Sequence, residues 1–266
     1  MATASCNLYT MSSRYIPVLL ALIGQVSQGA PVSKPDLIVV GAGISGLSAA
    51  LEAARAGLRV TVVELNTVPG GHAMISSGGL SLVGTPVQAK NHVVDTAEIA
   101  ERDFLRWGED ANSEWVRYYV RNSKTEIHDW ITALGTEFVA VSFNGGANSV
   151  PRFHSPAQQG LGLVNPVYRE ILRRGNVTFL FGHRATGLRM DGGRVTGVTM
   201  ENLREGKTVT LDGGAVLLST GGFAANLDLV RASWPKSMPV PERVLAGGGF
   251  FANGSGMEMA RQAGGA

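Results

Sequence analysis

The chain has 266 residues, of which 44% are hydrophobic and 17% charged, and its formal net charge is +2. This balance is typical of a globular protein with one large domain or two small ones, and the scattered lysines and arginines form no basic patch for nucleic acid. Cys6 is the only cysteine, and the histidines show neither HxxxH nor HExxH spacing. We therefore expect no disulfide framework, no metal site and no nucleic-acid partner.

The first thirty residues differ in kind from the rest. Arg14 precedes an apolar run from Ile16 to Ile23, and small and polar residues follow at 27–30. This order of a positive charge, an apolar stretch and a small-residue cleavage site predicts a signal peptide over residues 1–30. The apolar run is too short to be a transmembrane span. The protein is then exported, to the periplasm or the medium; if the segment is instead a disordered or mis-assigned extension, the protein is cytoplasmic.

Residues 36–66 have the pattern of a strand, a tight turn, a helix and a second strand. The turn contains a GxGxxG motif, in which Gly41 permits the sharp turn and Gly43 leaves room for a phosphate beside the backbone. Gly46 lets the helix pack closely on the strand. Because the free N–H groups and the positive end of the helix dipole face the phosphates, the motif predicts a dinucleotide site.

Glu64 ends the second apolar run, about 20 residues past the glycines. A carboxylate at this place accepts hydrogen bonds from ribose hydroxyls and favours a ribose without a 2′-phosphate, so the cofactor is expected to be FAD or NAD rather than NADP. A GxGxxG motif alone is weak in a chain with 35 glycines. The strand before it, the helix after it and the acid beyond it supply the context that the motif needs.

Residues 65–84 are rich in glycine and serine and show no clear periodicity. A segment with so few large side chains is either a surface loop or passes close to a flat ligand. Both interpretations stay open from the residue types alone.

The glycine motif, the pair Gly70-Gly71 and the segment Ser76-Ser77-Gly78-Gly79 together resemble the FAD-binding domain of the fumarate reductase/succinate dehydrogenase flavoprotein family. That family includes 3-oxosteroid 1-dehydrogenases and soluble flavocytochrome fumarate reductases. The resemblance implies FAD as the cofactor and an α/β, Rossmann-like FAD-binding domain with a parallel central sheet over residues 36–266. In the family, the loop after the ribose acid wraps the pyrophosphate and then runs along the isoalloxazine ring.

His72 stands six residues before Gly78. In the membrane-complex members of the family, a histidine at the matching place carries the flavin covalently, whereas soluble members bind FAD noncovalently. The residues after His72 depart from the covalent pattern, so a polar contact near the ring is favoured over covalent attachment.

Residues 96–135 have apolar side chains at three- and four-residue spacing, which predicts helices. The expected core residues of these helices are Trp115, Val116, Tyr119, Val120, Ile127, Trp130, Ile131 and Leu134. His128 falls one residue off this stripe, so we expect it at the surface or the edge. Residues 137–142 alternate like a short strand.

Arg152 and His154 follow a glycine-rich turn. They either face the flavin ring or an anionic substrate, or they lie on a solvated loop. Since the sequence shows no partner for them, the solvated loop is the favoured interpretation.

Residues 177–181 predict the next parallel strand, and the resemblance makes Ala185, shortly after it, a contact of the adenine through backbone groups. The stretches 185–202 and 206–220 alternate apolar and polar residues around Asp-Gly-Gly turns, which predicts a small antiparallel β-meander. Residues 215–219 are apolar on both faces, which predicts a buried central strand.

Two later motifs also resemble the family. The first is Ser219-Thr220-Gly221-Gly222-Phe223 with Asn226, whose small residues let the backbone approach FAD. The second covers residues 253–266, a helix start near the flavin that includes Gly256 and has Ser255 where most members have Asp. The expected cofactor-binding residues are Gly41, Gly43, Ser45, Gly46, Glu64, Leu65, Gly70, Gly71, His72, Ala73, Ser76, Ser77, Gly78, Gly79, Ala185, Thr220, Gly221, Gly222, Asn226 and Gly256.

The resemblance implies an FAD-dependent oxidoreductase that transfers a hydride between flavin N5 and a C–C bond of a dicarboxylate-like or ketosteroid-like small molecule. In the family a substrate-capping domain follows this point; it is apparently absent here, so no catalytic residue is assigned and weak FAD retention is expected. The chain is then a truncated part of a longer polypeptide or a natural short form. Two alternatives stay open: a flavin-binding or electron-transfer module that serves a redox partner protein, and an NAD-linked Rossmann dehydrogenase, against which the Ser-Gly-Gly and Thr-Gly-Gly segments argue.

Overall fold

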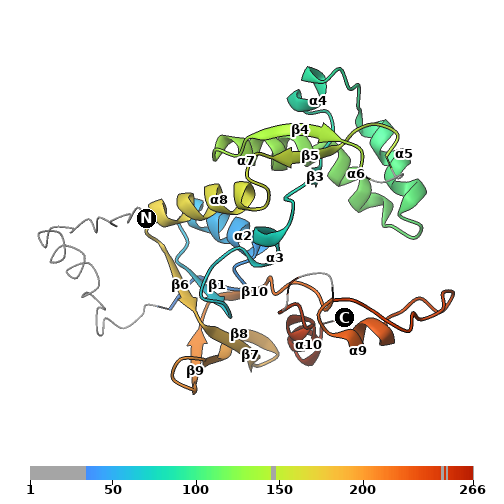
Figure 1. The fold of residues 1–266 in the computed structure, drawn as a ribbon. Helices are drawn as coiled ribbons and strands as arrows, with labels where there is room; N and C mark the ends of the chain where they lie inside the picture. Colours follow the sequence, from blue (N-terminus) through green and yellow to red (C-terminus); the bar gives the residue numbers. More distant parts are fainter. Residues whose placement is uncertain (1–33, 145–147, 247–248, 250, 266) are drawn as a thin grey trace, which may run out of the picture. The chain divides into compact units, whose positions relative to one another are not determined.

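The computed structural model describes residues 34–144, 148–246, 249 and 251–265 (Figure 1). The expected signal peptide over residues 1–30 lies outside them. The strands are β1 (Leu37–Val40), β2 (Val60–Glu64), β3 (Leu80–Ser81), β4 (Phe138–Ser142), β5 (Phe153–Pro156), β6 (Val177–Phe181), β7 (His183–Asp191), β8 (Arg194–Asn202), β9 (Lys207–Asp212) and β10 (Ala215–Leu218). The helices are α2 (Ile44–Arg55), α3 (Gly71–Ile75), α4 (Pro86–Lys90), α5 (Ala97–Trp107), α6 (Ser113–Asn122), the π-helical segment η1 (Ser123–Asp129), α7 (Trp130–Ala133), α8 (Leu161–Arg174), α9 (Leu227–Ala232) and α10 (Ser255–Gln262). No helix in these ranges is both long and apolar enough to cross a membrane.

The central sheet has the strand order β10-β1-β2-β6, and every neighbouring pair is parallel. Helices α2 and α8 lie together on one face of it (Figure 1). Their apolar side chains form a buried core with β1 and β2 that includes Val39, Leu47, Val62 and Val167. The predicted α/β fold with a parallel central sheet is therefore confirmed. Strand β2, which has neighbours on both sides, is buried along its whole length, as its continuous apolar run predicts.

The opposite face of the sheet is covered by the antiparallel sheet β7-β8-β9 (Figure 1). Val198 and Met200 of β8 pack against Ile38 and Val63 of the central sheet. The alternation of apolar and polar residues places one face of these strands in the core and the other in solvent. The predicted β-meander is confirmed.

Strand β10 does not have the buried central position that its apolar sequence predicts. Among the described strands it pairs with β1 alone, so it forms an edge of the sheet. Val216 and Leu218 pack toward the meander, whereas Leu217 on the other face is 37% exposed. The expectation was wrong because α2 packs on β1 and β2, and α8 packs on β6, rather than on this edge.

The predicted helices over residues 96–135 are confirmed, with two differences in their core. Val120 is buried as expected, but Trp115 is 71% exposed and touches Tyr118 in an edge-to-face pair. His128 is buried, stacked on Phe138 with ring centroids 5.6 Å apart, where a surface position was expected. The π-helical segment explains this error, because His128 lies within it and its wider turn departs from the 3.6-residue period on which the expectation rested.

A third, small sheet joins distant parts of the chain in the order β3-β5-β4. Strand β4 confirms the strand predicted at residues 137–142. Strand β5 pairs antiparallel with both β3 and β4, and its His154 lies opposite Leu80 of β3 and Val141 of β4. Strand β5 is thus the central strand, and it connects the glycine- and serine-rich segment before β3 to the helical region.

Candidate functional site: a dinucleotide cavity

The three glycines of the GxGxxG turn differ in what surrounds them. Gly41 has φ +102°, and a Cβ atom there would lie 2.4 Å from the carbonyl oxygen of Ser219. At Gly46 a Cβ would lie 2.0 Å from the carbonyl oxygen of Gly41. At Gly43 it would meet nothing within 4 Å. Gly41 and Gly46 are therefore required by the packing of the turn, whereas Gly43 keeps the space in front of the helix open.

Helix α2 begins at this open space without a side-chain cap. Gly43 is the N-cap residue and has no side chain to bond the first N–H groups, and the first turn contains no acidic residue. Ile44 and Ser45 of that turn line a cavity. Uncapped N–H groups at the positive end of a helix dipole form a site for an anion such as pyrophosphate.

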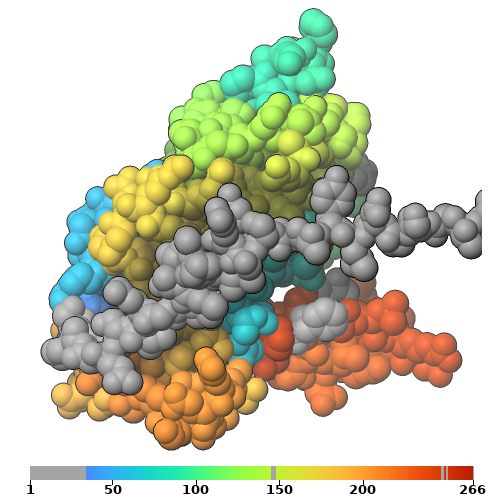
Figure 2. Space-filling view, turned by 60° about the vertical axis from the view of Figure 1, so that its left-hand side comes forward, coloured from blue at the N-terminus to red at the C-terminus, as the bar shows by residue number. Residues whose placement is uncertain are grey.

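This cavity has a volume of about 560 Å³ and extends from the start of α2 to α3. The expected binding residues that line it are Gly41, Gly43, Ser45, Glu64, Gly71, His72, Ala73, Thr220 and Gly221. Gly249, Phe251 and Ala252 close it from the C-terminal part of the chain, and an added Cβ at Gly249 would lie 3.5 Å from the Cβ of His72. Figure 2 shows the cyan segment that follows β2 beside red atoms of the C-terminal part.

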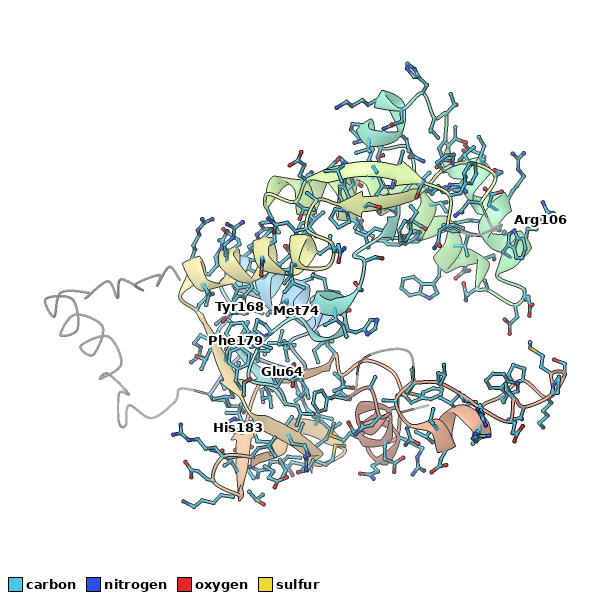
Figure 3. The ribbon with its side chains drawn as sticks, in the orientation of Figure 1. Glu64, Met74, Arg106, Tyr168, Phe179 and His183 are labelled. Atoms are coloured by element: carbon cyan, nitrogen blue, oxygen red, sulfur yellow. The ribbon has the colours of Figure 1, made fainter. Side chains whose placement is uncertain are left out.

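A second cavity of about 90 Å³ adjoins the first and shares Gly41, Glu64, Thr220 and Phe251 with it. Its other lining residues include Leu65 and Ala185, both expected binding residues, and His183. In Figure 3, Glu64 lies between Met74, on the wall of the larger cavity, and His183, on the wall of the smaller one. The two cavities together form an elongated space with Glu64 at the junction and the start of α2 in the larger part.

The Glu64 side chain is fixed at this junction by backbone donors on both sides. One carboxylate oxygen accepts a hydrogen bond from Ala42 N at 2.6 Å and the other from Asn66 N at 2.8 Å. The residue is only 7% exposed. Glu64 thereby ties the glycine turn to the loop after β2, and its remaining lone pairs are available for hydroxyl groups of a ligand.

Comparison with known proteins agrees with this geometry. The family model described as FAD binding domain matches residues 36–266. The chain belongs to this FAD-binding-domain family. The predicted family and the predicted FAD cofactor are confirmed.

The relatives of this FAD-binding domain include a steroid dehydrogenase and a fumarate reductase. A KsdD-like steroid dehydrogenase of Mycobacterium tuberculosis is 34% identical, over 87% of this chain and 46% of the relative. A cytochrome-type fumarate reductase of Shewanella frigidimarina is 31% identical, over 89% of this chain and 41% of the relative. The structure of the 3-ketosteroid-Δ4-(5α)-dehydrogenase of Rhodococcus jostii RHA1, in complex with 4-androstene-3,17-dione, superposes with a TM-score of 0.77 at 25% identity, covering 90% of this chain and 56% of the other. The chain thus spans less than half the length of the two curated relatives.

The residues of the FAD-binding domain fit FAD. The open space at Gly43 has the backbone N–H groups that a pyrophosphate requires, and the fixed carboxylate of Glu64 on the cavity wall can accept hydrogen bonds from ribose hydroxyls. The remaining space is divided between a smaller part at Ala185 and a larger part along α3, which matches the two unequal ends of FAD.

The other expected binding residues do not line the cavities and lie in the segments around them. Gly70 N donates to Ala42 O at 2.7 Å, and Ser76 Oγ donates to Ala73 O at 2.8 Å at the end of α3. Four glycines pack closely on neighbouring groups: Gly46 on Gly41, Gly78 on Gln159, Gly79 on the Phe153 ring and Gly256 on Thr220. The Gly222 carbonyl accepts a hydrogen bond from Gly254 N, and Asn226 is the N-cap residue of α9. Ser77 is exposed.

Some cavity residues were not predicted from the sequence. Phe251 lines both cavities, and Gly249 and Ala252 line the larger one. A glycine run that precedes the last family-like motif is the only sequence feature that points to them. Met74 and Ile75 were passed over because only their glycine and serine neighbours carried the motif.

Arg152 and His154 are both fully buried, so the expectation of a solvated loop was wrong. The Arg152 guanidinium forms a bidentate pair with Asp95, through Nε at 2.8 Å and Nη2 at 2.7 Å. Its Nη1 also donates to Asp103 and, at 3.1 Å, to Asn148. Asp95 and Asp103 lie 57 and 49 residues away from Arg152 in the sequence, which is why the sequence did not reveal these two partners.

The surroundings of His154 favour a neutral imidazole, because burial lowers the pKa of the ring. Its Nδ1 lies 2.6 Å from Arg152 O, which can only accept, so Nδ1 carries the proton. In the neutral ring Nε2 then carries no proton and accepts from Thr85 Oγ1 at 2.6 Å. Burial alone would raise the pKa of the Asp103 carboxyl, but the hydrogen bonds from Arg152 and Ser149 more than offset this effect, so the pKa of Asp103 is lowered.

We expect stability to fall with pH below about 6.5, because the unfolded chain binds a proton at His154 while the folded protein does not. Because the pKa of His154 is lower in the folded protein, its neutral ring contributes fully to the free energy of unfolding above the ordinary histidine pKa. This contribution is lost as the pH falls from there toward the pKa of the folded protein. The slope contributed by one histidine is at most about 1.4 kcal/mol per pH unit. Urea unfolding at a series of pH values between 8 and 4.5 measures it, and His154→Gln should show a shallower slope. An equal slope in the variant would contradict this role.

Proposed function

We propose that this chain is the FAD-binding part of an FAD-dependent oxidoreductase that transfers a hydride between flavin N5 and a C–C bond of its substrate. The single observation that carries the proposal is the open space at Gly43, in front of an uncapped helix and next to a fixed, buried carboxylate. When bound, FAD would supply the redox chemistry.

Each part of the cavity has a separate task in this proposal. The N–H groups at the start of α2 bind the pyrophosphate, and Glu64 accepts hydrogen bonds from ribose hydroxyls. Leu65 and Ala185 line the smaller part, which receives the adenine. The larger part, along α3 with His72 and Ile75, then receives the isoalloxazine ring.

The substrate is proposed from the relatives. Their names include steroid dehydrogenases and fumarate reductases, so the candidate classes are a ketosteroid-like enone and a dicarboxylate. A second candidate function, a flavin module that passes electrons to a redox partner protein, is favoured by the open side of the cavity. Val68 and Ile75 on the wall of the larger cavity are 54% and 66% exposed, which leaves the flavin end accessible.

The purified protein should bind FAD noncovalently, because the residues after His72 depart from the covalent pattern. Binding should be reversible, because the flavin end of the cavity is open to solvent. The test is an absorbance spectrum before and after acid precipitation, on protein supplemented with FAD and freed of excess. Yellow colour that passes to the supernatant is the expected result. Colour that stays in the pellet would show covalent attachment and make His72 the residue to replace. A colourless protein that takes up no FAD would refute the proposed function.

A further inference from the structure

A buried ion cluster lies in the protein outside the cavity. It consists of Asp95, Arg152 and Asp103, and the side chains of Asp95 and Arg152 are 0% exposed. Gln88 Nε2 donates to Asp95 at 2.9 Å, and Ser149 donates to Asp103 through both its backbone N and its hydroxyl at 2.8 Å. Every charged group of the cluster thus has more than one hydrogen-bond partner.

Such a cluster is poorly explained by stability alone. Removing one cation and two carboxylates from water is costly, and apolar side chains of similar volume often give equal or greater stability. A bidentate pair adds geometric specificity, because the planar guanidinium donates its hydrogen bonds in a fixed fork geometry. The cluster therefore fixes the place of the backbone that carries Arg152.

That backbone leads directly into β5. The Arg152 carbonyl accepts from Leu82 N at 3.1 Å and from His154 Nδ1 at 2.6 Å. Phe153 is opposite Ser81, and its ring occupies the space where a Cβ of Gly79 would be, at 1.7 Å. The start of β5 thus determines where β3 and the residues before it lie.

The residues that follow β5 contact the same loop from the other side. Gly160 N donates to Ser76 O at 3.1 Å, and a Cβ at Gly160 would lie 1.7 Å from Ala73 O in α3. A Cβ at Gly78 would lie 2.6 Å from the carbonyl carbon of Gln159. The segment over residues 153–160 is therefore in contact with the loop over 76–79 and with the end of α3 that lines the larger cavity.

We propose that the Asp95–Arg152–Asp103 cluster is a positioning device for the flavin end of the cavity, which acts through β5 on α3 and on the loop over residues 76–79. The proposal rests on the proposed function, since it needs FAD in this cavity. It concerns one end of the ligand only: the contacts at Gly43, Glu64 and Ala185 come from other elements. Arg152 touches no ligand in this role and is a positioning residue.

The test compares two ligands, FAD and ADP, on protein freed of flavin. ADP has the adenine, ribose and pyrophosphate but lacks the flavin, so it reports only the end of the cavity that the cluster does not position. Asp95→Asn keeps an oxygen acceptor for Arg152 but removes the charge. We expect this variant to bind FAD about tenfold more weakly, with the affinity for ADP changed by less than about twofold.

Arg117→Met is the matched control, because it removes an exposed pair between α5 and α6, with Glu101, in the same region of the chain. It should change neither affinity. Should Asp95→Asn not fold, Ser149→Ala is the second variant, since it removes a hydrogen bond to Asp103 of the cluster without removing a charge. Melting curves of the flavin-free variants identify the temperature at which all are folded.

The outcomes separate the two proposals. An equal loss of FAD and ADP affinity would overturn the positioning role, because a general loosening of the fold affects both ligands. Unchanged affinity for both would overturn it as well. If the unaltered protein binds neither FAD nor ADP, the proposed function itself fails.

Discussion

Replacement of Arg152 by methionine is expected to lower the free energy of unfolding by about 3–5 kcal/mol. The substitution leaves Asp95, whose side chain is 0% exposed, and Asp103, whose side chain is 11% exposed, without their shared cation. Methionine fills much of the volume but donates no hydrogen bond, so two carboxylates remain desolvated and close together. Unfolding in urea, followed by circular dichroism and tryptophan fluorescence, measures the loss.

Two further variants show whether the unpaired charge is the cause. Arg117→Met removes an exposed ion pair and should cost at most about 1 kcal/mol. The triple variant Arg152→Met, Asp95→Leu, Asp103→Leu removes the whole cluster and should regain most of the stability lost by the single one. A loss below about 1 kcal/mol for Arg152→Met alone would show that the cluster is not stabilised by mutual pairing.

The parts of the fold that sequence predicted are those with local patterns. The first strand, the glycine turn and α2 could be predicted from residues 36–66 alone, because hydrophobic periodicity and glycine spacing are patterns of neighbouring residues. The meander β7-β8-β9 was predicted in the same way, from alternation between Asp-Gly-Gly turns. Hydrophobicity alone does not show whether a strand has neighbours on both sides. Strand β10 was therefore expected at the centre, although it lies at an edge of the described sheet.

The errors in the helical region and in the ion cluster have physical causes that the sequence conceals. His128 is turned inward by a π-helical segment, and no residue in Ser123–Asp129 marks that wider turn. Arg152 finds its partners 57 and 49 residues earlier in the chain, so its burial depends on the tertiary fold. For the cavity, motif residues such as Gly43 and Glu64 were predicted, whereas Phe251 is brought there by a distant segment.

Gly43→Val should abolish most FAD binding and leave the fold intact. Gly43 has φ −67° and ψ 174°, which valine adopts without strain, and an added Cβ meets nothing within 4 Å. The new side chain would occupy the space beside the first N–H groups of α2, so the pyrophosphate could no longer reach them. The loss of such charge-assisted hydrogen bonds corresponds to an affinity about 100-fold lower.

The contrast with the neighbouring glycine makes this result specific. Gly46→Ala places a Cβ 2.0 Å from the carbonyl oxygen of Gly41 and should lower the unfolding free energy, because backbone must move to accept it. Gly187→Val in β7 is the control for the chemical change, since its added Cβ also meets nothing within 4 Å, and it should bind FAD normally. Titration of flavin-free protein with FAD, followed by flavin fluorescence, gives the affinities, and urea unfolding gives the stabilities. Unaltered FAD affinity in Gly43→Val would mean that the pyrophosphate does not lie at the start of α2, and the assignment of the whole cavity would fall with it.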